Sequence, residues 1–130
     1  MASTYHGKPY YPAWLHNLAD DVTGEGPAWD GKIEGAAAVH EAVVGARDIY
    51  EFQEFHYAGP CGEHHFLENY TSAVRGEPLF VIVLVTLNAD GMAQQLVVNH
   101  RPRSSVLTLS RAMYEKFQGT PLAKHWANTP

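Results

Sequence analysis

The run LFVIVLV, from Leu79 to Val85, is the sequence feature that most constrains the fold. Seven apolar residues are too few to span a bilayer, since a membrane-spanning helix needs about 20. A short apolar run bounded by turn residues is typical of a buried strand. Turn signals precede it at Arg75–Pro78 and follow it at Asn88–Gly91. We therefore predict a central strand over 78–87 with an antiparallel neighbour on each side.

A further turn signal at Ala58–Gly62 adds one more hairpin, and the series becomes an antiparallel meander. The expected strands of the meander cover residues 50–57, 63–75, 78–87 and 92–101. Two shorter strands are expected before it, at 20–25 and 29–35, joined by Gly26-Pro27.

Helical spacing of apolar residues predicts a helix from Ala36 to Tyr50 and a second over 104–118. Residues 11–18 have room for one or two helical turns. Gly45 lies in the middle of the first helix, where it lowers helix stability by up to about 1 kcal/mol relative to alanine. Close approach of another element is the usual reason for such a glycine. Helices laid on an antiparallel meander predict an α+β fold.

Length, charge and cysteine content limit the class of protein. A chain of 130 residues is long enough for one domain that needs no disulfide or metal. The formal charge of −5, without a basic stripe, argues against nucleic acid and anionic membrane surfaces as partners. Cys61 is the single cysteine, so no intrachain disulfide can form. Because the N-terminus also lacks the apolar core of a signal peptide, we expect a cytoplasmic protein.

The register of the strands determines which residues face the interior. We align the first hairpin about its Ala58–Gly62 turn, which places Tyr57 opposite Glu63, and the second so that Tyr70 lies opposite Val83. One face then carries most of the aromatic and branched side chains, and we assign it to the interior. The predicted wall of an internal pocket consists of Tyr50, Phe52, Phe66, Tyr70, Val83, Val85, Gln94, Leu96 and His100. A slip of one residue would exchange the two faces.

The histidines of the first hairpin do not predict a metal site. His64 and His65 are neighbours on a strand and point to opposite faces, so they cannot easily bind one ion. His56 lies opposite His64 in this register, but no cysteine or carboxylate supplies further ligands at a standard spacing. We expect solvated histidines and no metal. Cys61 lies in a turn without a base partner, so a nucleophilic role is not expected.

Several short motifs occur in the order seen in one protein superfamily. They are ADDV at Ala19–Val22, GKIEG at Gly31–Gly35 before the helix, DG at Asp90-Gly91 and RP at Arg101-Pro102. In this order the chain resembles the nuclear transport factor 2-like superfamily, and within it the SnoaL-like branch. The resemblance covers about residues 11–103.

The resemblance implies a cone-like α+β barrel in which a curved antiparallel sheet wraps on helices around a deep pocket. It also implies a homodimer formed through the outer face of the sheet. The chain divides accordingly into a flexible N-terminal arm at 1–10, the cone domain at 11–103 and a C-terminal helical extension at 104–130. This extension is additional to the family pattern, and the usual long first helix is reduced to about 11–18.

In catalytic members of the superfamily, an Asp, Glu or His inside the apolar cone acts as the acid or base. Glu68 is the first candidate here, because desolvation between Phe66 and Tyr70 would raise the pKa of its carboxyl group. The alternative is a different register that leaves Glu68 in solvent. Asp20 and Asp21 lie in the ADDV motif, where one of the two is expected to face inward as a second acid.

Three classes of function are compatible with these residues. The preferred one is a protein that binds a small apolar or carbonyl-bearing ligand in the cone. The second is an isomerase, cyclase or dehydratase that works by acid–base chemistry without a cofactor. The third is a dimeric interaction module that binds no ligand. A desolvated inward carboxyl favours the enzyme, an entirely apolar pocket the binding protein, and a filled cone the interaction module.

Overall fold

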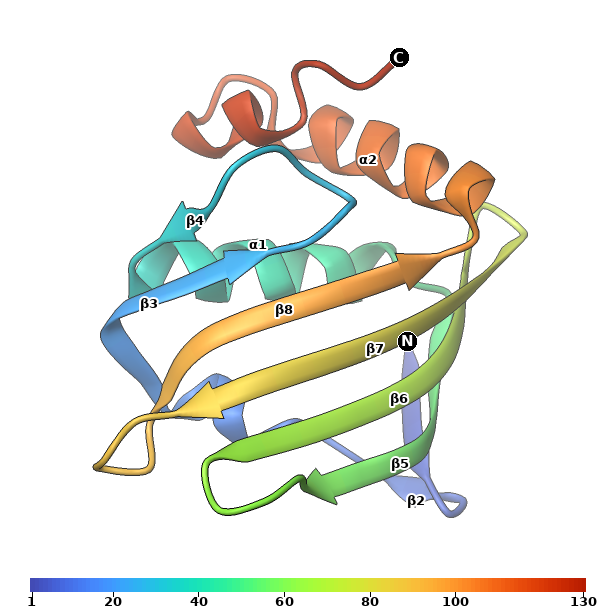
Figure 1. The fold of residues 1–130 in the computed structure, drawn as a ribbon. Helices are drawn as coiled ribbons and strands as arrows, with labels where there is room; N and C mark the ends of the chain where they lie inside the picture. The colour runs from blue at the N-terminus through green and yellow to red at the C-terminus, as the bar shows by residue number, and fades with distance from the viewer.

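The structure is a computed structural model that describes residues 1–130, and it contains one curved sheet with two α-helices and two 3-10 helices (Figure 1). The strands are β1 (Ala2–Tyr5), β2 (Lys8–Pro9), β3 (Leu18–Glu25), β4 (Ile33–Glu34), β5 (Phe52–Pro60), β6 (His65–Val74), β7 (Glu77–Leu87) and β8 (Ala93–Arg101). The helices are η1 (Ala13–His16), α1 (Ala36–Ile49), α2 (Arg103–Phe117) and η2 (Pro121–His125). The predicted α+β class is confirmed.

The strand order in the sheet is β2-β1-β5-β6-β7-β8-β3-β4. Strands β5 to β8 form the predicted antiparallel meander. However, β1 pairs with β5 and β3 pairs with β8 in parallel, which is possible because long connections separate these strands along the chain. The sheet is therefore mixed and open at both edges, whereas the sequence predicted an antiparallel barrel.

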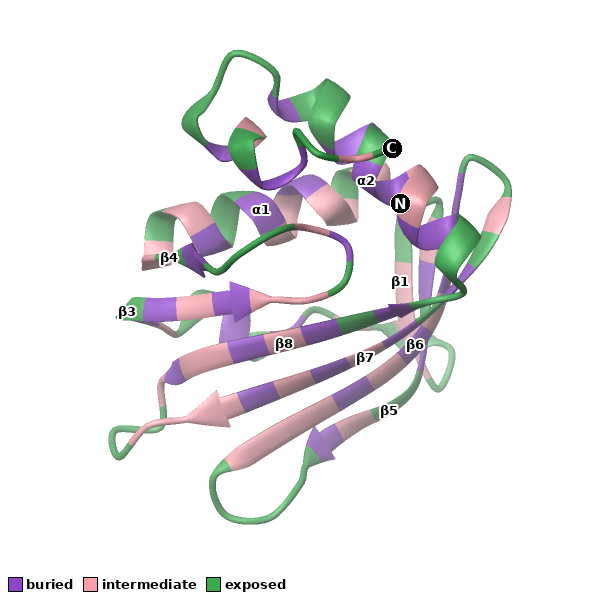
Figure 2. Ribbon diagram, turned by 45° about the horizontal axis from the view of Figure 1, so that its top comes forward, coloured by how far each residue is buried: buried purple, intermediate pink, exposed green.

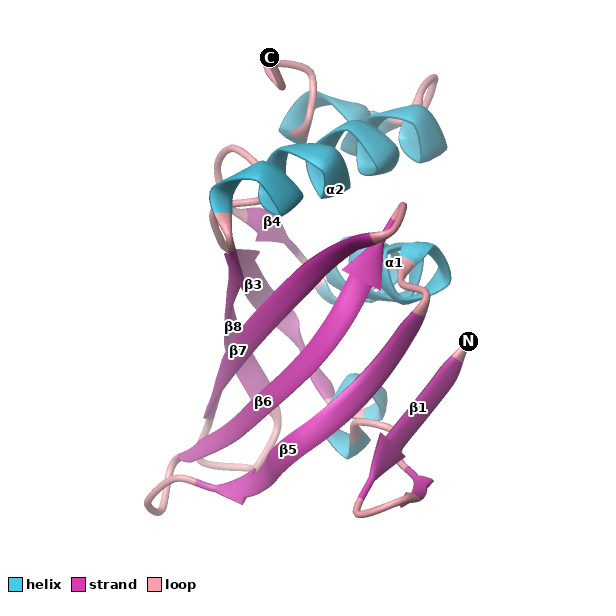
Figure 3. Cartoon of the chain, turned by 90° about the vertical axis from the view of Figure 1, so that its right-hand side faces the viewer, coloured by secondary structure: helices cyan, strands magenta, loops and turns pink.

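Helix α1 lies on the inner side of the sheet, and α2 lies above one end of it (Figure 3). Both helices begin and end within one residue of the predicted bounds. Buried and more exposed residues alternate along β7 and β8, as expected for strands with one face on the core (Figure 2). The inner face of the sheet and the two helices therefore enclose the core.

At Gly45, helix α1 is approached closely by a side chain of α2. A Cβ atom placed on Gly45 would lie 2.6 Å from Cζ and 2.8 Å from Cε2 of Phe117 on α2. Phe117 is buried and stacks on Trp126, with ring centroids 5.4 Å apart, so its ring has little freedom to move. The expected close approach at this glycine is confirmed.

We predict that Gly45→Ala destabilises the protein, although alanine is the better helix former by about 1 kcal/mol. Overpacking against Phe117 should exceed that gain and leave a net loss of about 1–3 kcal/mol in the free energy of unfolding. Urea denaturation measures the change. The double variant Gly45→Ala/Phe117→Leu should recover part of the lost stability. Equal or greater stability of Gly45→Ala would contradict the role given to this contact.

The first hairpin differs from its predicted register. Phe55 pairs with Tyr70 and Pro60 with Phe66, with a bulge between Phe55 and Tyr57. Residues 58–60 continue the strand, and the turn lies at 61–64 instead of 58–62. The shift exchanges the faces of β5, so Gln53 and Phe55 are buried. The later strands keep their predicted faces, because Tyr70 pairs with Val81 rather than Val83, a shift of two residues.

Both ends of the chain pack on the cone. Residues expected to form a flexible arm instead form β1 and β2, and β1 extends the sheet beside β5. At the other end, η2 packs against α2, and Leu122 and Trp126 are buried. None of the helices is both long enough and apolar enough to cross a membrane.

Candidate functional site

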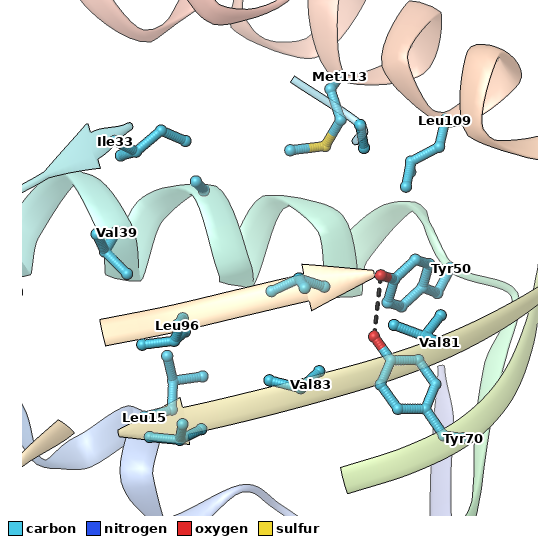
Figure 4. Close-up of a cluster of buried hydrophobic side chains, with 14 of the residues drawn as sticks. Leu15, Ile33, Val39, Tyr50, Tyr70, Val81, Val83, Leu96, Leu109 and Met113 are labelled. Carbon is cyan, nitrogen blue, oxygen red and sulfur yellow. Dashed lines mark hydrogen bonds between the residues drawn. The ribbon is translucent and has the colours of Figure 1, made fainter. Parts of the chain in front are cut away.

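A cavity lies between the inner face of the sheet, α1 and the C-terminal segment. Its volume is about 60 Å³, room for roughly four to six water molecules at about 10–15 Å³ each. Hydrophobic residues make up 16 of the 22 that line it. Figure 4 shows part of this wall, with Val83 and Leu96 on strands and Leu109 and Met113 reaching in from α2. The cone is thus not completely filled by its own side chains.

Five of the nine predicted pocket residues lie on the cavity wall, and so does Glu68. The five are Tyr50, Tyr70, Val83, Leu96 and His100. Four of them come from β6, β7 and β8, where the predicted faces agree with the structure. Tyr50 instead lies at the C-terminal end of α1, not on the strand that was predicted to carry it.

The other predicted pocket residues lie elsewhere. Phe52 follows the shifted register of β5 and is off the cavity wall. Phe66 is half-buried and Val85 fully buried, but both pack in the core outside the cavity. Gln94 is the unpaired residue of a bulge in the β7–β8 pairing, and its Nε2 donates to Asp21 Oδ1 at 2.8 Å outside the cavity.

Asp20 and Asp21 are both exposed, contrary to the expectation that one of them faces inward. The pairing of β3 with β8 is irregular between Leu18 and Thr23, so the simple alternation of the strand is lost there. Ala19 and Val22 on either side are buried instead. Neither aspartate lines the cavity.

Glu68 is the acidic group inside the cone. It is 1% exposed, and its Oε2 accepts a hydrogen bond of 2.7 Å from the Tyr10 hydroxyl. Burial raises the pKa of the Glu68 carboxyl, and this outweighs the lowering by Tyr10, Trp14 and Arg47. The protonated carboxyl therefore persists to a higher pH than in an exposed glutamate.

A second polar group lies at the end of α1. Arg47 Nη1 donates to Gln53 Oε1 at 2.8 Å, and its guanidinium lies 4.8 Å from the centre of the Tyr11 ring. Arg47 and Gln53 both line the cavity. Neither residue was predicted from the sequence, although Arg47 lies one turn after Val43 on the inward face of the predicted helix.

Three buried side chains form a hydrogen-bonded chain across the sheet. The Tyr70 hydroxyl donates to the Tyr50 hydroxyl at 3.0 Å, as the dashed line in Figure 4 shows. The Tyr50 hydroxyl and His100 Nε2 are 2.6 Å apart. Since the Tyr50 oxygen already accepts from Tyr70, its own proton goes to Nε2, and the His100 ring proton is then on Nδ1.

Burial keeps this chain uncharged. It lowers the pKa of His100 to about 3 and raises the pKa of both tyrosines. At neutral pH, His100 is therefore a neutral imidazole and the tyrosines are neutral phenols. The chain can donate hydrogen bonds to a polar ligand but carries no charge of its own.

The histidines of the first hairpin do not meet in the structure. His56 Nε2 lies 2.7 Å from Thr71 Oγ1, and His64 is exposed in the turn. No group of three or more His, Cys, Asp or Glu side chains is arranged to hold a metal ion.

No protein-family model and no curated protein matches the sequence. Solved structures do match. A bacterial protein with a cystatin-like fold from Silicibacter pomeroyi is 21% identical, with a TM-score of 0.75 over 82% of this chain and 74% of its own. A steroid delta-isomerase from Pseudomonas aeruginosa is 18% identical, with a TM-score of 0.73 over 81% and 77%.

A protein of the SnoaL-like family from Agrobacterium tumefaciens is 13% identical, with a TM-score of 0.54 over 68% of this chain and 78% of its own. Identities this low establish the fold and not the activity. The chain has the fold of the nuclear transport factor 2-like proteins, with SnoaL-like structures among its neighbours. The resemblance found in the sequence is thus confirmed at the level of the fold.

Proposed function

We propose that this protein binds a small uncharged molecule in the cavity between the sheet, α1 and the C-terminal segment. The observation that carries the proposal is a largely apolar cavity with a few polar groups on its wall, among them Glu68 and Tyr70. Ligand sites typically combine an apolar lining with a few polar groups that orient the ligand. At about 60 Å³, the cavity must widen to hold a molecule of more than a few non-hydrogen atoms, and we include this widening in the proposal.

A thermal-shift screen of small ketones, ethers and hydrocarbons tests this proposal, because a ligand that binds only the folded state raises its stability. Ala42 lies on the cavity wall and Ala37 on the exposed face of the same helix. Ala42→Leu should fill the cavity and remove the ligand-dependent increase in Tm, whereas Ala37→Leu should keep it. If the ligand still raises the Tm of the Ala42→Leu variant, the ligand binds outside this cavity.

A second candidate is acid–base catalysis without a cofactor, and the position of Glu68 favours it. A carboxyl group that is 1% exposed, with a raised pKa, at the wall of a cavity suits proton transfer to or from a bound molecule. The neighbouring steroid delta-isomerase structure is consistent with this candidate, but its likeness extends to the fold alone. For both candidate functions, we also propose that the protein is cytoplasmic.

We also propose a homodimer formed through the outer face of the sheet. Leu67, Leu84 and Val97 lie directly beside one another on three neighbouring strands of that face. Phe80 on the same face is 42% exposed. An apolar row of this kind on a sheet surface is suited to contact with a second copy.

Sedimentation at micromolar concentration should give twice the 14.4 kDa of one chain. Leu84→Lys should shift the protein to the monomer, because it would place an unpaired charge in the contact. Ala37→Lys, which makes the same charge change on exposed α1, should leave the dimer intact. A wild-type protein that sediments as one chain would contradict the proposal.

A further inference from the structure

Several residues that line the cavity carry a buried polar atom without a hydrogen-bond partner. Four buried side-chain nitrogen or oxygen atoms have no hydrogen-bond partner in the protein, and three of them belong to cavity residues. These three are Trp14 Nε1, His100 Nδ1 and Trp126 Nε1, on side chains that are 8%, 5% and 1% exposed. The fourth, Ser3 Oγ, lies on β1. Buried polar atoms are normally paired, so three orphans around one cavity call for an explanation.

All three of these atoms are hydrogen-bond donors. An indole nitrogen can only donate. His100 Nδ1 carries the ring proton, because Nε2 accepts from Tyr50. Trp14 lies close enough to Glu68 to lower the pKa of that carboxyl, yet its N–H has no partner within normal hydrogen-bond geometry. The cavity thus presents donors without matching acceptors.

The same donors carry no charge. His100 is neutral because burial lowers its pKa to about 3, and indoles do not ionise. The nearby cation, Arg47, already donates to Gln53. An acceptor oxygen therefore matches these groups, and an uncharged one suits the largely apolar wall, whereas a donor-only cation such as an amine would meet N–H groups on several sides.

The donors also come from different walls. Trp14 lies on η1, His100 on β8 and Trp126 at the end of η2. Trp14 lies beside Glu68 on β6, two strands from β8, which is about 10 Å at normal strand spacing. One oxygen atom cannot accept from all of them.

We propose that the ligand is an uncharged molecule with a hydrocarbon frame and more than one acceptor oxygen, of the ketone, lactone or ether class, and that the N–H groups of Trp14, His100 and Trp126 donate to those oxygens. This proposal rests on the proposed function, since it names the chemistry of the ligand held in the same cavity. It also gives the C-terminal extension, through Trp126, a part in recognition.

The test compares two probes of the same shape, cyclohexanone and methylidenecyclohexane, which differ in having an oxygen or a CH₂ group. Each is titrated into ¹⁵N-labelled wild-type protein while the indole N–H signals are recorded. Trp29 is an internal control, because it also lines the cavity but its Nε1 already donates to Gly24 O at 3.3 Å. Cyclohexanone should move the proton signal of Trp14 or Trp126 downfield, and methylidenecyclohexane should not.

Trp126→Phe and Trp14→Phe remove one donor each. At least one of them should weaken cyclohexanone binding about fivefold, the effect of losing one net hydrogen bond, and change methylidenecyclohexane binding less than twofold. If both probes bind and move the indole signals alike, the inference about acceptor oxygens is overturned while the binding proposal stands. If neither probe binds, both proposals fail.

Discussion

If Glu68 acts as the acid–base group proposed above, replacing it with glutamine should lower the rate at which the protein exchanges the α-protons of a bound ketone by about 10²–10⁴-fold. In this reaction the carboxylate takes an α-proton of cyclohexanone, and in D₂O a deuteron returns to the same carbon. Glutamine keeps the shape of the side chain but cannot accept that proton. Loss of the cyclohexanone α-proton signal by ¹H NMR gives the rate directly.

The pH dependence provides a second test of the same residue. Only the ionised carboxylate acts as the base, and burial raises the pKa of Glu68 above 4.5. Exchange should therefore increase with pH through that raised pKa and then level off. Glu63→Gln, at an exposed turn position, should keep the wild-type rate. A Glu68→Gln protein with wild-type exchange would exclude Glu68 as the base and leave ligand binding as the function.

Acidification should destabilise the protein through His100, and this is the largest stability effect that we expect. The folded protein holds His100 neutral down to a pKa of about 3, whereas the unfolded chain takes up a proton near the ordinary value of 6.5. Between these two values the unfolded state binds more protons, so stability falls as the pH falls. His100 alone should make the free energy of unfolding fall by up to about 1.4 kcal/mol for each pH unit of acidification in this range.

His100→Gln should remove that contribution while keeping an acceptor for the Tyr50 hydroxyl. Urea denaturation at several pH values between 6.5 and 3 measures the slope for each variant. His40→Gln, at an exposed position on α1, is the matched control and should leave the slope unchanged. An unchanged slope in His100→Gln would show that this imidazole is not held neutral by the fold.

Periodicity and turn signals in the sequence were sufficient to predict the two helices and the four-stranded meander. The apolar run at Leu79–Val85 and the spacing of Val39, Val43 and Ala46 each repeat one pattern over a whole element. The parallel pairs β1–β5 and β3–β8 have no such local signature, because they join segments far apart in the chain. The error in the first hairpin came from placing its turn at the glycine-rich residues 58–62, whereas the strand continues to Pro60 and the turn begins at residue 61.

Residues of the candidate site could be predicted only on strands whose inward face could be predicted. Glu68 and Tyr70 on β6 and Leu96 on β8 line the cavity because those strands alternate regularly. The irregular pairing of β3 removed the basis for placing Asp20 or Asp21 inside. Tyr10 and Trp126 reach the site from the two ends of the chain, and no local pattern indicates contacts across such separations.

Binding of a small molecule inside the cone is the central claim, and a methionine methyl signal tests it most directly. Of the three methionines, Met113 lines the cavity and is 3% exposed, whereas Met1 and Met92 lie off its wall. In protein with ¹³C-labelled methionine methyl groups, cyclohexanone should shift the Met113 signal saturably, leave the other two in place, and have no effect in Ala42→Leu. A Met113 signal that does not respond, or that moves equally in Ala42→Leu, would contradict the account.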